Sequence, residues 1–287
     1  MLLWATTPLA IKWSGEGPGF LFGVTGRMTI GAVCLWSALA MLRRRLPWHR
    51  QARLTYLAVA LQIFGSMLVI YWAAQFIPSG WTAVVFGLTP LITALMAAVW
   101  LGERSLGWGK LLSYGMGLAG LALMFGTALA FSHEAARGIG GVLLSAFLHS
   151  ASSVWVKRIG ARLSAWYQVA GGLLLALPAY LAVWWWFDGE WPDALPLTSL
   201  AAIVYLGVIA TTLGFAGYYY VLAKLPATRV ALITLVTPVL SLMLGHAANQ
   251  EPLTLRVVLG TALILGALLV HEFADRFQRI PRKAHKM

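Results

Sequence analysis

Polar and aromatic side chains recur at helical spacing inside otherwise apolar stretches of this sequence. Tyr205, Thr212 and Tyr219 follow one another every seven residues, so they share one face of a helix. Tyr71 stands in a similar stretch, with Gln62 a little over two helical turns before it. A tyrosine that faced lipid at mid-depth would leave its hydroxyl without a hydrogen-bond partner. We therefore expect both faces to point inward and to line a binding cavity.

Five further side chains are candidates for the same cavity. Trp4 and His149 coincide when the chain is shifted by 145 residues, and Gln168 is polar within another apolar stretch. Trp155 fits either the cavity or ordinary packing. Arg27 is the one arginine clearly inside an apolar stretch. Such a charge needs water, a partner or headgroups, so Arg27 either receives a substrate carboxylate near the exit or extends outward to the membrane surface.

The residue types that carry covalent or metal chemistry are not grouped in this sequence. No Cys/His/Asp/Glu cluster has the spacing of a metal site, and no nucleotide-binding Walker A motif occurs. None of the nine acidic residues falls in the middle of an apolar stretch, so no carboxylate is placed to carry protons across a membrane. We expect no metal and no cofactor. Besides a transporter, an intramembrane enzyme and a non-transporting membrane scaffold remain as alternative functions.

Composition indicates which elements position the candidate residues. Of the 287 residues, 60% are hydrophobic and 10% are charged, whereas about 25% are charged in a soluble domain. A transmembrane helix needs about 20 mostly apolar residues. The sequence predicts ten such helices, the first of them short, over residues 2–13, 20–42, 54–77, 80–100, 107–130, 138–157, 164–187, 197–222, 227–248 and 253–273.

Basic residues are distributed very unevenly between the two predicted sides of the membrane. With the N-terminus inside, seventeen lysines and arginines fall on the inner side and three on the outer side. This bias follows the positive-inside rule and predicts that both termini are cytoplasmic. The net charge of +12 therefore indicates topology and contact with anionic lipid headgroups, and we expect no nucleic-acid partner.

The two halves of the chain resemble each other. A shift of 148 residues places Tyr71 on Tyr219, and a shift of 145 aligns the front ends. We interpret residues 1–130 and 138–273 as two five-helix repeats, followed by a basic cytoplasmic tail at 274–287. Because five is odd, the second repeat enters the membrane upside down, which is the architecture of secondary transporters with a central site.

Prolines and glutamates recur in the same frame. Pro90 coincides with Pro238, and Glu103 with Glu251, under the shift of 148 residues. A proline inside a helix removes a backbone hydrogen bond, so the pair predicts two bends that flank one cavity, with Pro8 as a third candidate. Each glutamate precedes the next apolar stretch, where a carboxylate can meet the positive end of that helix. We expect a structural role for both carboxylates.

The segment "IPSGWTAVVFGLTPLITALMAAVWLGERSLGWGKLLSYGMGLAGLALM" and the first-helix segment "LLWATTPLAIK" resemble the drug/metabolite transporter superfamily, in its bacterial EamA type with ten helices in two repeats. The resemblance covers nearly the whole chain, although "AANQE" in the second half replaces the usual Leu-Gly-Glu. Within the superfamily, the abundance of aromatic residues is most similar to aromatic amino-acid exporters.

The resemblance implies an all-α membrane transporter in the bacterial inner membrane. We expect it to export amino acids, aromatic and other neutral ones, and related small metabolites by alternating access without ATP hydrolysis. The absence of a mid-span carboxylate predicts transport without obligatory carboxylate-based proton coupling. An exporter of lipophilic cations or drugs is the alternative, since aromatic faces offer cation–π contacts. A monomer already contains both halves, so it suffices as the working unit.

Overall fold

The computed structural model describes residues 2–102, 108–131, 133–225 and 237–278. Every regular element within these ranges is a helix, as the composition predicts. The elements are α1 (Leu2–Gly15), α2 (Phe20–Met41), α3 (Arg50–Ala60), η1 (Leu61–Ser66), α4 (Met67–Ala73), α5 (Ser79–Phe86), α6 (Thr89–Leu101), α7 (Trp108–Phe131), α8 (His133–Ile159), α9 (Ala165–Phe187), α10 (Leu197–Tyr205), η2 (Leu206–Gly214), α11 (Phe215–Lys224), α13 (Thr237–Asn249) and α14 (Leu255–Gln278).

The described part of the chain holds six helices that are long and apolar enough to cross a membrane. They cover Phe20–Met41, Arg50–Ala73, Ser79–Leu101, His133–Ile159, Ala165–Phe187 and Leu197–Lys224, and shorter apolar stretches cover Leu111–Met124 and Leu255–His271. The protein is therefore an all-helical, multi-pass membrane protein. The total of ten spans and the cytoplasmic placement of both termini stay predictions.

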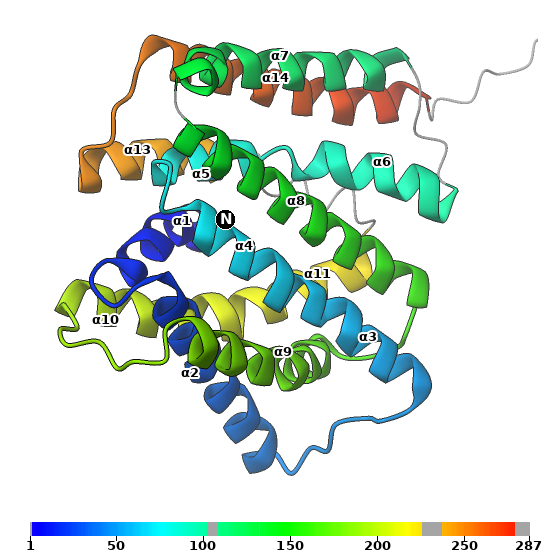
Figure 1. The fold of residues 1–287 in the computed structure, drawn as a ribbon. Helices are drawn as coiled ribbons and strands as arrows, with labels where there is room; N and C mark the ends of the chain where they lie inside the picture. The colour runs from blue at the N-terminus through cyan, green and yellow to red at the C-terminus, as the bar shows by residue number, and fades with distance from the viewer. Residues whose placement is uncertain (1, 103–107, 132, 226–236, 279–287) are drawn as a thin grey trace, which may run out of the picture.

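The connections between helices gather at two opposite ends of the bundle. Figure 1 shows the α1–α2, α9–α10 and α13–α14 connections at one end and the α2–α3 and α8–α9 connections at the other. We call the first the Glu251 end and the second the Arg43 end, after a residue in the α13–α14 and in the α2–α3 connection. The Glu251 end contains the acidic residues Asp188, Glu190 and Asp193, and is the predicted outer side.

Helix bounds recur at the offset seen in the sequence. Helix α13 has the bounds of α6 displaced by 148 residues, and η1 displaced by the same amount falls within η2. Both α6 and α13 are followed by a residue with a left-handed backbone, Gly102 with φ 66° and Gln250 with φ 51°. The division into two inverted five-helix halves remains our prediction from the sequence.

Pro90 and Pro238 lie in the first turn of a helix, and this corrects the expected mid-helix bends. Pro90 is the second residue of α6, and Pro238 is the second residue of α13. In a first turn the proline's missing N–H has no intrahelical partner to lose. The chain before Pro90 breaks into a turn between α5 and α6. Pro8, in contrast, lies inside α1 and removes the hydrogen bond that would reach the Trp4 carbonyl.

Helices α7 and α14 lie side by side at one edge of the bundle (Figure 1). Gly120 and Gly260 make this approach possible, since a Cβ on either residue would lie within 2.9 Å of the other's carbonyl oxygen. The motif "GMGLAG" at 115–120 thus packs helices against each other, as its setting in an apolar stretch indicates.

Candidate functional site: a central cavity

One cavity lies where helices from the first and second parts of the chain meet. Its volume is about 110 Å³, less than the roughly 300–1,000 Å³ of drug-sized pockets. The lining residues come from α1, α2, η1, α4, α5 and α6 in the first part and from α8, η2, α11 and α13 in the second. Those that carry the argument are Trp4, Pro8, Arg27, Gln62, Phe86, His149, Phe215 and Tyr218.

Arg27 is the only lysine, arginine, aspartate or glutamate among the described residues that line the cavity. Its side chain is 2% exposed, so it does not extend outward to headgroups, and that alternative is wrong. Its Nε donates to Thr211 Oγ1 at 2.9 Å and its Nη1 donates to Tyr71 Oη at 3.4 Å. The guanidinium carbon also lies 5.9 Å from the ring centre of Tyr71 and 5.8 Å from that of Phe215. Within the described residues, no carboxylate neutralises this charge.

Close packing of α2 against η2 brings Arg27 to Thr211. A Cβ on Gly31 would lie 2.5 Å from the Thr211 methyl, and a Cβ on Gly207 would lie 2.7 Å from Ile30, so only glycine permits this approach. Thr212, the predicted cavity residue, instead donates to its own helix at the Gly207 carbonyl, 3.1 Å away, and does not line the cavity. The reason is that η2 is a π-helix, whose wider turn shifts the face that the seven-residue spacing predicts.

Gln62 lines the cavity from η1, the other π-helical segment. Its Oε1 accepts a 2.6 Å hydrogen bond from Tyr219 Oη, and the side chain is 1% exposed. Tyr71 and Tyr219 are buried as predicted, but they lie behind the cavity wall rather than on it. Each tyrosine holds a cavity-lining polar side chain: Tyr71 holds Arg27, and Tyr219 holds Gln62.

Aromatic side chains also line the cavity. Trp4 and His149, which the sequence pairs, both line the cavity and both contact Tyr218, with ring centres 5.8 Å and 5.1 Å away. Phe86 lies 5.3 Å from His149. His149 Nδ1 is buried and has no hydrogen-bond partner among the described residues. The sequence interpretation missed Tyr218, which is the neighbour of the predicted Tyr219 in "YYY" at 218–220.

Three predicted cavity residues lie elsewhere. Gln168 donates from Nε2 to the Leu163 carbonyl at 3.0 Å, next to the α8–α9 connection. Tyr205 joins α10 to α1 through a 2.6 Å hydrogen bond with Thr6 Oγ1. Trp155 is half-buried near the end of α8. None of the three lines the cavity.

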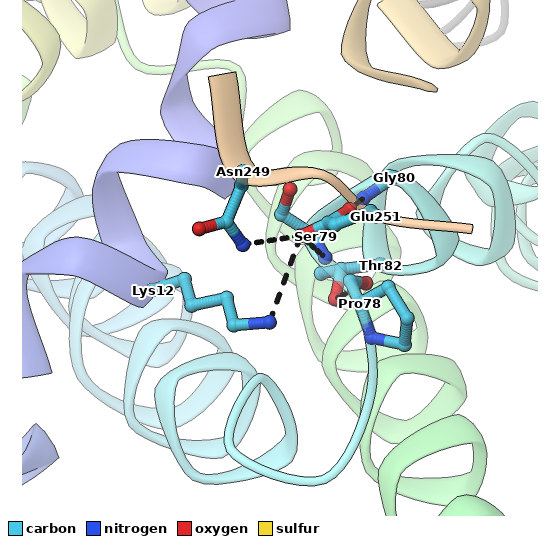
Figure 2. A network of polar contacts seen from close by, with 7 residues as sticks. All are labelled: Lys12, Pro78, Ser79, Gly80, Thr82, Asn249 and Glu251. Atoms are coloured by element: carbon cyan, nitrogen blue, oxygen red, sulfur yellow. Dashed lines mark hydrogen bonds and ion pairs between the residues drawn. The ribbon is translucent and has the colours of Figure 1, made fainter. Parts of the chain in front are cut away.

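Glu251 forms a compact polar cluster at the Glu251 end of the bundle (Figure 2). Its Oε1 accepts from the Ser79 N–H at 2.9 Å and from Asn249 Nδ2 at 3.1 Å, and its Oε2 accepts from the Gly80 N–H at 3.0 Å. Lys12 Nζ lies 3.6 Å from Oε1. We expected a carboxylate at the start of the following helix, α14. The carboxylate instead caps α5, whose first residue, Ser79, lies 172 residues before Glu251 in the sequence.

The local backbone holds the Glu251 carboxylate in place. The Glu251 N–H donates to the Gly245 carbonyl at 3.1 Å, and Gly245 has no side chain to collide with Oε2. Burial alone raises the pKa of the Glu251 carboxyl, but hydrogen bonds from the Gly80 and Ser79 backbone and from Asn249 outweigh it. The net pKa therefore lies below the ordinary value, and the group is ionised at neutral pH. Its predicted repeat mate, Glu103, lies outside the described residues.

Comparison with known proteins finds a transporter family and similar exporters. A model of the EamA-like transporter family matches residues 1–126 and 136–271. A probable terminal-alkyne amino-acid exporter from Streptantibioticus cattleyicolor is 25% identical over 94% of this chain and 93% of its own length. A probable amino-acid metabolite efflux pump from Escherichia coli is 23% identical over 75% of each chain. A solved crystal structure at 24% identity shares the fold, with a TM-score of 0.70 over 96% of this chain and 95% of the other.

Proposed function

Because the chain belongs to the EamA-like transporter family, we propose that it exports amino acids, aromatic and other neutral ones, and related small metabolites by alternating access. The observation that carries this proposal is the buried Arg27 guanidinium in a cavity otherwise lined by neutral and aromatic side chains. Two relatives are named as amino-acid or amino-acid metabolite exporters. Transport needs no ATP hydrolysis by this chain, and a monomer in the bacterial inner membrane suffices.

Each part of an aromatic amino acid has a complementary group in the cavity. The carboxylate binds Arg27, which has N–H donors beyond the two that Thr211 and Tyr71 accept. The apolar side chain packs among Trp4, Phe86 and Tyr218. The amino group donates to His149 Nδ1, which has no other partner among the described residues.

Alternating access requires each end of the cavity to open in turn. In this conformation Glu251 ties the start of α5 to the α13–α14 connection and to Lys12 of α1. Opening at the Glu251 end, our predicted outer side, separates these elements and breaks the carboxylate's bonds to α5. Lipid headgroups at the basic Arg43 end hold the other side of the bundle at the cytoplasmic face.

Lipophilic cations, the alternative substrates, are disfavoured by the same cavity. Its aromatic rings suit a cation, but no acidic side chain occurs among the described lining residues, and Arg27 repels a second positive charge. Cation flux through the purified protein would reverse this preference.

The direct test is transport by the purified protein in liposomes. We expect saturable flux of labelled phenylalanine, tyrosine and leucine that is unchanged by an imposed pH gradient. Trp4→Ala should reduce flux of the aromatic substrates more than that of leucine, whereas Trp48→Ala, at an exposed tryptophan outside the cavity, should leave both unchanged. Absence of amino-acid flux, or strict dependence on the pH gradient, would contradict the proposal.

A further inference from the structure

The cavity is asymmetric in charge. It offers one fixed positive group, Arg27, and no negative group among the described lining residues. A substrate carboxylate that leaves water regains an ionic partner in this cavity, whereas a substrate ammonium finds only neutral acceptors such as His149 Nδ1 and Gln62. The two charged groups of an amino acid are therefore unequally matched.

We infer that the site selects its substrate by the carboxylate and does not require the amino group. The substrate class then extends from neutral amino acids to small monocarboxylate anions with an aromatic or apolar body. This inference rests on the proposed transport function and narrows it, because it names which part of the substrate is obligatory.

The fixed geometry of Arg27 supports a carboxylate receptor. Thr211 and Tyr71 take up Nε and Nη1, which orients the guanidinium plane, and Nη2 has no partner among the described residues. The rings of Tyr71 and Phe215 stand at similar distances from the guanidinium carbon and restrict its rotation. A preoriented guanidinium that still has free N–H donors is suited to bind a planar carboxylate.

Selection by the carboxylate has an electrical consequence. A monocarboxylate without an amino group carries one negative charge across the membrane, because Arg27 belongs to the protein and does not cross with it. A potential of 100 mV is worth about 2.3 kcal/mol per charge, which corresponds to a concentration ratio of about 50-fold. A membrane potential that is negative inside the cell drives such an anion outward, so export needs no proton-carrying carboxylate.

Three substrates that share a benzyl body separate the two groups. L-Phenylalanine has both groups, 3-phenylpropanoate lacks the amine, and phenethylamine lacks the carboxylate. Labelled efflux is measured at pH 7.5 from liposomes with the full-length protein, with empty liposomes as the baseline, and with and without a potassium-diffusion potential that is negative inside. Arg27→Lys and Arg27→Gln are compared with Arg53→Gln, which removes an exposed arginine outside the cavity.

We expect 3-phenylpropanoate to cross at least as fast as phenylalanine, to be accelerated by the potential, and to slow at least tenfold in Arg27→Gln. Arg27→Lys should retain part of the flux, and Arg53→Gln should retain all of it. Phenethylamine flux equal to that of the two acids, or acid flux unchanged by Arg27→Gln in well-folded protein, would overturn the inference. Phenylalanine flux without 3-phenylpropanoate flux would overturn it too while leaving the proposed function intact. 3-Phenylpropanoate flux without phenylalanine flux would contradict the proposed amino-acid export and still support the carboxylate site.

Discussion

Two buried charges, Arg27 and Glu251, occupy opposite kinds of environment in this protein. Glu251 accepts three hydrogen bonds and has Lys12 beside it, so its charge is matched within the chain. Arg27 donates to two neutral hydroxyls and meets no anion among the described residues. The charge of Glu251 therefore joins helices and stabilises the fold. The charge of Arg27 has no counter-ion in the cavity, which is costly unless a substrate anion binds there.

Replacing Arg27 by an apolar side chain should have the largest effect on transport and little effect on stability. Arg27→Met should reduce flux of carboxylate substrates at least tenfold, because their ionic partner is gone. The free energy of unfolding should change by only about 1 kcal/mol, since loss of the unmatched charge offsets the loss of bonds to Thr211 and Tyr71. Transport assays and thermal unfolding of the same preparation measure both effects. A large loss of stability would mean that Arg27 is a structural residue.

Replacing Glu251 should lower the stability of the protein and leave substrate affinity nearly unchanged. Glu251→Gln removes the charge that caps α5 and pairs with Lys12, so we expect a loss of about 1–2 kcal/mol in unfolding free energy. Substrate affinity measured in the folded protein should stay within about twofold, because a twofold change is only about 0.4 kcal/mol and Glu251 does not touch the cavity. Denaturant unfolding and ligand binding are the measurements, with Glu190→Gln in the exposed α9–α10 connection as the control.

The pH dependence of stability tests whether the ionised Glu251 carboxylate stabilises the fold. Its pKa is lower in the folded state than in the unfolded state, so its contribution is fully present above the ordinary carboxyl pKa. The contribution is lost as the pH falls from that value through the lower folded pKa. The stability difference between the natural protein and Glu251→Gln should therefore shrink on acidification. A difference that grows with falling pH would contradict a depressed pKa.

Thr211 and Thr212 provide a finer test at the Arg27 side. Thr211→Val leaves Arg27 Nε without its acceptor, so we expect a weaker substrate affinity by about 1 kcal/mol, or roughly fivefold. Thr212→Val is the matched control, because its hydroxyl donates only to its own helix at Gly207. The KM for 3-phenylpropanoate distinguishes the two. Equal effects would mean that the π-helical register of η2 does not position Arg27.

Lys12 should contribute least to the stability of the protein. Its Nζ lies 3.6 Å from the Glu251 carboxylate and its side chain is 30% exposed, so the ion pair is partly solvated. Lys12→Met should cost about 0–1 kcal/mol and less than Glu251→Gln, because the bonds to Ser79, Gly80 and Asn249 remain. Thermal unfolding at low and high salt checks this, and an effect larger than that of Glu251→Gln would make Lys12 the principal partner of α5.

Sequence periodicity predicted the helices well because apolar length is a strong and local signal. Trp4 and His149 were predicted because they coincide in the two halves of the chain, and Gln62 because it is polar within an apolar helix; all three line the cavity. Thr212 was predicted and Thr211 was missed because a seven-residue spacing assumes α-helical turns, and η2 is a π-helix. No residue pattern specifies that local change of pitch.

Polar contacts between residues far apart in the chain could not be predicted from the sequence. Glu251 was expected at the start of its own following helix, yet it caps α5, because the fold brings the α13–α14 connection beside Ser79. Such a partner depends on tertiary packing and not on spacing. Arg27 was left between two roles, and only its burial distinguishes a cavity group from one that reaches the headgroups.

The most direct measurement is an experimental structure of the full chain with bound 3-phenylpropanoate. We expect the ligand carboxylate to lie within hydrogen-bond distance of the Arg27 guanidinium, which Thr211 and Tyr71 still hold, and the ligand ring to lie among Trp4, Phe86 and Tyr218. A ligand bound away from Arg27, or a guanidinium paired with a carboxylate of the protein itself, would contradict it.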